Sequence, residues 1–71
     1  MTTQTATEAL NERIRSAMTE QGVSQEVLAS TLGMRQRQVS DRVRGVVEWR
    51  SSELAVVAEH LGITLTFGGA L

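Results

Sequence analysis

The stretch GVSQEVLASTLGMRQRQVSDRVRG, residues 22–45, decides the fold of this 71-residue chain. Ser24 is placed to cap a short helix and Gly33 to end it, because serine caps helix N-termini and glycine adopts the left-handed conformation at C-termini. A second helix is expected over about residues 36–44, and Gly45 ends it. The stretch therefore predicts two short helices joined by a tight turn. Their buried positions are expected to be Val27, Leu28, Leu32, Val39 and Val43.

Helical periodicity continues on both sides of this stretch. A first helix is expected after Thr5, which can form a capping box with Glu8. A last helix is expected to begin at Ser51 or Ser52 and to end at Gly62. The apolar residues that recur at helical spacing are Leu10, Ile14, Ala17 and Met18 in the first and Leu54, Val57, Ala58 and Leu61 in the last.

The tail, residues 63–71, breaks the helical pattern. Ile63, Leu65 and Phe67 alternate with threonines, a period of two that favours a short β-strand. Ile63 and Phe67 also stand four residues apart, so a short fifth helix is the alternative. The sequence therefore predicts a single compact all-α domain of four to five helices, with residues 1–4 as a disordered tail.

Composition excludes several classes of protein. The chain has no cysteine and one histidine, so we expect neither a disulfide nor a metal site. No acid–base pair, activated nucleophile or phosphate-binding glycine loop is present, and so short a chain has little room for a deep pocket. We therefore expect no enzyme, no cofactor and no small-molecule ligand. Nothing resembles a signal peptide or a membrane span, which predicts a soluble protein of the cytoplasm.

Charge is unevenly distributed along the chain, although the net charge is only −1. Residues 35–50 hold five arginines against Asp41 and Glu48, a local charge of +3, while residues 1–34 and 51–71 each carry −2. A local basic face matters more for docking onto DNA than the overall sum. Arginine pairs with phosphate, and arginine and glutamine can each form two hydrogen bonds with a base edge. The basic helix therefore points to double-stranded DNA as the partner.

Short motifs stand in a characteristic order along the chain: Ser24-Gln25-Glu26, Leu28-Ala29, Leu32-Gly33-Met34, Val39-Ser40, Arg44-Gly45, Glu53-Leu54, Ala58 and Leu61-Gly62-Ile63. In this order the chain resembles the Cro and lambda-repressor type of helix-turn-helix domain, the Xre family, over about residues 8–67. The resemblance implies a five-helix bundle that binds a two-fold-related operator, usually as a dimer. Because the alternating tail departs from the usual fifth helix, we expect it to pair across the two-fold axis through Ile63, Leu65 and Phe67.

The basic helix turns one face away from the two valines that are expected to point inward. The N-terminal turn of such a helix approaches base edges, and the resemblance places base readers at Gln36, Arg37, Ser40 and Asp41. Arg37 is the best candidate for bidentate pairing with guanine, and Gln36 or Gln38 could pair with adenine. The expected base contacts are Gln36, Arg37, Gln38, Ser40 and Asp41.

Asp41 is unusual on this face, because phosphate repels a carboxylate. It is expected either to accept a hydrogen bond from cytosine N4 or to hold Arg37 or Arg44 in place, and an exposed charge without a role is the third alternative. Phosphate contacts are expected from the N-terminus of the preceding helix and from the other arginines of the segment. These residues are Gln25, Arg35, Arg42, Arg44 and Arg50.

Three side chains outside this set are expected to have other roles. Trp49, the only tryptophan, is expected to anchor the core. Arg13 and Arg15 lie among glutamates and are expected to form a solvated face of the first helix.

The function expected from these observations is sequence-specific regulation of transcription. We expect a repressor of the phage Cro or immunity-repressor kind that binds a palindromic operator as a homodimer through the major groove. It would act in a bacterial host cytoplasm or nucleoid. The alternative is a protein–protein module, an antitoxin or anti-repressor on a helix-turn-helix frame, which the overall acidity and the apolar tail favour. A non-specific architectural DNA binder is less consistent with the net charge of −1, because such proteins usually carry a strong net positive charge.

Overall fold

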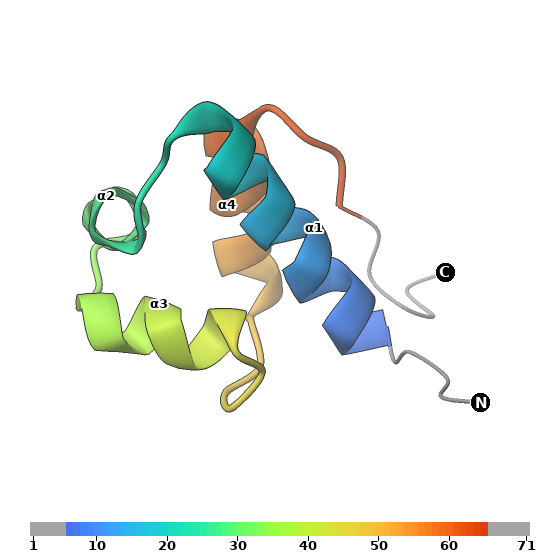
Figure 1. The fold of residues 1–71 in the computed structure, drawn as a ribbon. Helices are drawn as coiled ribbons and strands as arrows, with labels where there is room; N and C mark the ends of the chain where they lie inside the picture. The colour runs from blue at the N-terminus through green and yellow to red at the C-terminus, as the bar shows by residue number, and fades with distance from the viewer. Residues whose placement is uncertain (1–5, 66–71) are drawn as a thin grey trace.

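Four helices make up the part of the chain that the computed structural model describes, residues 6–65. They are α1 (Ala6–Gln21), α2 (Gln25–Leu32), α3 (Gln36–Val43) and α4 (Ser51–Leu61). α1 and α4 pack on each other, and α2 and α3 lie on one side of this pair (Figure 1). The predicted all-α bundle is confirmed. Thr5, the expected cap of the first helix, lies outside the described residues.

The core is the point where the four helices meet. Each helix sends one side chain with no exposed surface to its centre, namely Ile14, Leu28, Val39 and Val57. Around them lie the other buried apolar residues, Ala17, Met18, Ala29, Val43, Leu54 and Leu61. Val27 was expected to be buried, but the structure leaves it 45% exposed. One residue along a helix turns the side chain by about 100°, and α2 directs its Leu28 and Ala29 side to the core instead.

Side chains of α1 close the C-terminal ends of two other helices. The Arg15 guanidinium donates a hydrogen bond from Nη1 to the Val43 carbonyl oxygen at the end of α3, at 2.7 Å. Gln21 donates in the same way from Nε2 to the Leu61 carbonyl oxygen at the end of α4. The last carbonyls of a helix lack intrahelical donors, and a cation is favourable there. Arg15 therefore does more than form the solvated face that the sequence predicted.

The loop between α3 and α4 is tied to α1 through Trp49. The half-buried indole packs against the core, which confirms the predicted anchor. Its Nε1–H donates to Oδ1 of Asn11 at 2.7 Å, and Asn11 is only 2% exposed. A buried amide oxygen requires such a donor, so this bond fixes both the loop and the roll of α1.

The turn between α2 and α3 forms as the sequence predicts. Ser24 caps α2, since its Oγ accepts a hydrogen bond from the Val27 N–H at 3.1 Å. Gly33 ends α2 in the left-handed conformation at φ 70°, which glycine adopts without a steric penalty. The Met34 N–H then donates to the Ala29 carbonyl at 3.0 Å, which closes the helix end. Three residues, 33–35, therefore suffice to redirect the chain into α3.

Beyond α4 the described chain has no regular structure at residues 63–65. The Ile63 N–H donates to the Ala58 carbonyl at 3.0 Å, and the side chains of Ile63 and Leu65 pack, half-buried, against the core. Phe67, the third residue expected at a dimer interface, lies outside the described residues. Two of the three apolar side chains predicted for dimerisation therefore already cover the core of their own chain.

Candidate nucleic-acid interface

α3 lies at the edge of the molecule, with one side against the core (Figure 1). Val39 and Val43 are 0% and 2% exposed, so this pair sets which way the helix faces. The first turn of α3 places Gln36, Arg37 and Gln38 in solvent, and Ser40 is half-buried. The amphipathic pattern read from the sequence is therefore the pattern that the structure presents.

Gln36 and Arg37 are the free members of the predicted base-reading set. Both are exposed, and neither side chain forms a hydrogen bond or ion pair with the described residues. Gln38 differs, because its Oε1 accepts the Arg35 backbone N–H at 2.8 Å and thereby caps α3. Half of the Gln38 amide is thus committed within the chain, and only its NH₂ group is available to a ligand.

Asp41 forms an ion pair on the surface of α3. Its Oδ1 lies 2.8 Å from Nη2 of Arg44, one turn further along the helix, and Arg44 Nε donates to the Ser40 carbonyl at 3.3 Å. The Arg44 side chain is 62% exposed and that of Asp41 is 24% exposed. Among the roles considered for Asp41, holding Arg44 is the one that this geometry displays. The ion pair leaves the Arg44 side chain largely exposed.

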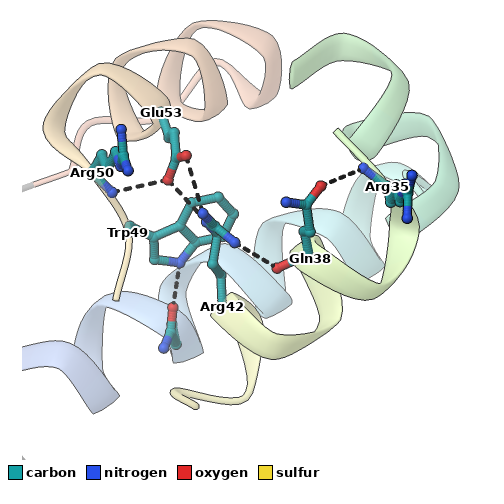
Figure 2. Close-up of polar contacts among 7 residues, drawn as sticks. Arg35, Gln38, Arg42, Trp49, Arg50 and Glu53 are labelled. Carbon is teal, nitrogen blue, oxygen red and sulfur yellow. Dashed lines mark hydrogen bonds and ion pairs between the residues drawn. The ribbon is translucent and has the colours of Figure 1, made fainter. Parts of the chain in front are cut away.

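Arg42, which the sequence predicts to contact phosphate, is paired within the protein. Its guanidinium forks onto Glu53 of α4, with Nε to Oε1 at 2.9 Å and Nη2 to Oε2 at 3.3 Å, while Nη1 donates to the Gln38 carbonyl at 3.1 Å (Figure 2). The two side chains are only 12% and 15% exposed. A charge in this segment is therefore neutralised inside the protein, which a count of arginines cannot reveal.

Glu53 is held ionised by its surroundings. Burial alone would raise the pKa of this carboxyl, but the hydrogen bonds from Arg42 and from the Arg50 backbone N–H, with the charges of both arginines, lower the pKa below its ordinary value. Oε1 of Glu53 accepts a second hydrogen bond, from the Arg50 backbone N–H at 2.9 Å. Glu53 therefore caps the start of α4 in addition to pairing with Arg42. α4 begins at Ser51, as predicted, and its N-cap residue is Arg50, whose backbone N–H is satisfied by the Glu53 side chain.

This lowered pKa predicts an acid-sensitive contribution to stability. A carboxyl whose pKa is lower in the folded state stabilises the protein above its unfolded pKa, about 4.3, and loses this contribution as the pH falls through the folded value. Glu53→Gln is expected to lower the free energy of unfolding by about 1–2 kcal/mol at neutral pH. The difference from the wild type should shrink on acidification. Urea unfolding followed by circular dichroism over a pH series measures it.

The matched control for this prediction is Glu48→Gln. Glu48 is an exposed carboxylate in the loop that precedes α4 and forms no ion pair with the described residues. Its replacement is expected to leave the pH dependence of unfolding as in the wild type. A Glu53→Gln protein whose unfolding shows the wild-type pH dependence would contradict the assignment.

The other predicted phosphate contacts lie on three different elements. Arg35 and Arg50 are exposed in the segments that lead into α3 and α4, and Gln25 is half-buried in the first turn of α2. Gln25 lines an open groove together with Arg15 and Val43, so the N-terminus of α2 and the C-terminus of α3 share one border. The sequence did not predict that Arg15 lies at this border. Its positive charge is the only property in the sequence that could have indicated this position.

The described residues contain no helix long and apolar enough to span a bilayer. Within the same residues no group of three or more histidine, cysteine, aspartate or glutamate side chains could hold a metal ion.

Comparison with known protein families identifies a helix-turn-helix domain in this chain. A family model described as helix-turn-helix matches residues 14–67, a range that includes α2, the turn, α3 and α4. A search among curated proteins and a search among solved structures each gave no significant match.

Proposed function

The chain belongs to the Xre-like helix-turn-helix family of Cro and lambda repressor, a family of DNA-binding transcription regulators, and we propose that it is a sequence-specific repressor. The observation that carries the proposal is the first turn of α3. There Gln36 and Arg37 are exposed and unpaired within the described chain, while Val39 fixes the opposite face in the core. These are the side chains that can form two hydrogen bonds with one base.

In the proposed mode of binding, some residues of the interface contact bases and others contact phosphates. α3 enters the major groove with its N-terminal turn leading, so that Arg37 meets guanine O6 and N7 and Gln36 meets a neighbouring base. The exposed arginines Arg35, Arg44 and Arg50, and the N-terminus of α2 beside Gln25, contact the backbone and fix the register. Arg42 is left out of the phosphate set, since Glu53 already occupies its guanidinium.

The proposed assembly is a homodimer on a palindromic operator. Two copies related by a two-fold axis place their α3 helices in successive major grooves, about 34 Å apart. The repressor occupies promoter DNA and so blocks transcription, in the manner of phage Cro or immunity repressors, within the bacterial cytoplasm or nucleoid. Residues 63–71 remain the proposed dimer contact. Because Ile63 and Leu65 already pack on the core, Phe67 has the larger share of this role.

Selection of bound sites from random double-stranded DNA tests the proposed function. The expected result is an enriched sequence with two-fold symmetry whose half-sites are centred about one helical turn, 10–10.5 base pairs, apart. Enriched sequences without two-fold symmetry would contradict the proposed homodimer. A protein that at low salt binds no site more tightly than random DNA would overturn the proposal and leave the protein–protein module as the explanation.

A further inference from the structure

We propose that the Arg42–Glu53 ion pair is a positioning device that holds α3 in the orientation needed to read bases. This inference rests on the proposed function and goes beyond it. It assigns a role in DNA recognition to Glu53, a carboxylate on a helix that is not expected to touch DNA, and it withdraws Arg42 from the DNA contacts.

α3 and α4 are connected to each other through side chains. α2 packs against both α3 and α4, and α1 does the same, but no Cα atom of α3 lies within 8 Å of a Cα atom of α4. Between these two helices the polar link in the described structure is the fork from Arg42 to Glu53, at 2.9 and 3.3 Å. Figure 2 shows the two side chains meeting across the space between the ribbons. The ion pair therefore sets the distance between α3 and α4, which no close approach of their backbones sets.

α3 is anchored in the core along one side only. The helix has eight residues and is buried through two valines, Val39 and Val43, which lie one turn apart on one line along its surface. These two contacts, and the hydrogen bond from Arg15 to the Val43 carbonyl at the C-terminal end, give little resistance to rotation of α3 about this line. Arg42 ends on α4, so it adds an attachment to a different element.

Further hydrogen bonds continue from both members of the ion pair. Arg42 Nη1 donates to the Gln38 carbonyl, and the Gln38 side chain caps the start of α3 at Arg35. On the other side, Glu53 Oε1 also accepts the Arg50 N–H at the start of α4. The orientation of the first turn of α3, where Arg37 lies, is therefore connected to the frame of α4 through bonded groups (Figure 2).

Electrostatics gives the inference a discriminating test, because Glu53 is negative near a surface proposed to bind a polyanion. If Glu53 acted only through its charge, its neutralisation would strengthen binding to every DNA sequence. If it positions α3, neutralisation weakens binding to the operator while binding to other DNA does not weaken. The two explanations thus predict opposite signs for the same variant.

The experiment compares Glu53→Gln with Glu48→Gln on two duplexes, one that carries the site selected by the wild-type protein and one with that site scrambled. Affinities are measured at a temperature where circular dichroism shows both variants folded. Glu53→Gln is expected to bind the selected site about 5- to 30-fold more weakly, the equivalent of about 1–2 kcal/mol, and the scrambled duplex no more weakly than the wild type. Glu48→Gln removes the same charge without the pair, and is expected to weaken neither.

Arg42 variants provide the second measurement. Arg42→Lys keeps the charge but loses the fork, and is expected to lose part of the preference for the selected site. Arg42→Gln is expected to keep the wild-type salt dependence on the scrambled duplex, because no phosphate contact is removed. A fall of about one in that salt slope would make Arg42 a phosphate contact and overturn the inference.

Two further outcomes separate the inference from the proposed function. If the wild type prefers its selected site and Glu53→Gln shows the same preference, the positioning role of the pair is overturned and the proposed function stands. If the wild type binds both duplexes equally, the proposed function fails, and the role in recognition fails with it.

Discussion

Replacing Leu28 with alanine is expected to lower the free energy of unfolding by about 2–5 kcal/mol, the range seen when a buried leucine is truncated. Leu28 has no exposed surface, and its side chain fills the centre of the core from α2. A domain of this length is stable by only about 4–10 kcal/mol in total. The variant should therefore be partly unfolded at 37 °C, with a thermal midpoint far below that of the wild type. Thermal and urea unfolding followed by circular dichroism measure both quantities.

Val27→Ala is the control in the same helix. Val27 is adjacent to Leu28 but 45% exposed, so its truncation removes few contacts and is expected to change stability by less than about 1 kcal/mol. Equal losses for the two variants would contradict the packing described for α2. Tight binding to a selected operator should restore part of the stability lost in Leu28→Ala, because a ligand that binds only the folded state stabilises it.

The helices and most of the core could be predicted because they follow from local rules. Capping by Ser24, the left-handed Gly33 and the spacing of Val39 and Val43 each depend on residues within one or two turns. Val27 shows the limit of these rules, since a short helix with adjacent apolar residues leaves the direction of its buried face open. Packing against α3 and α4 decides in favour of Leu28 and Ala29.

The contacts that the sequence did not predict join residues far apart in the chain. Arg15 reaches a carbonyl 28 residues away, Gln21 one 40 residues away, and Arg42 a carboxylate 11 residues away. A backbone carbonyl has no side-chain identity that could mark it in a sequence as an acceptor. The ion pair between Asp41 and Arg44 was among the alternatives because its partners are three residues apart on one helix. The sequence therefore predicts on which face of a helix a candidate site residue lies, whereas the tertiary fold determines which residues it contacts.

Replacing Arg37 with alanine is expected to have the largest effect on DNA recognition. Loss of one bidentate contact with guanine weakens binding by about 1–3 kcal/mol, and in a homodimer the loss occurs in both half-sites. Arg37 is exposed and makes no ion pair with the described residues, so its removal should leave the fold intact. Site selection with the variant is expected to give a sequence with relaxed preference at one base pair of each half-site.

Two variants separate base reading by Arg37 from the effect of its charge. Arg13→Ala removes another exposed arginine, on α1, and is expected to leave the selected sequence unchanged. Arg37→Lys keeps the charge but cannot form the planar fork, so the same base pair should lose its preference while binding to scrambled DNA is retained. If Arg37→Ala instead weakens binding equally for all sequences and lowers the salt slope by about one, Arg37 contacts phosphate, and the base-reading role passes to Gln36 and the amide group of Gln38.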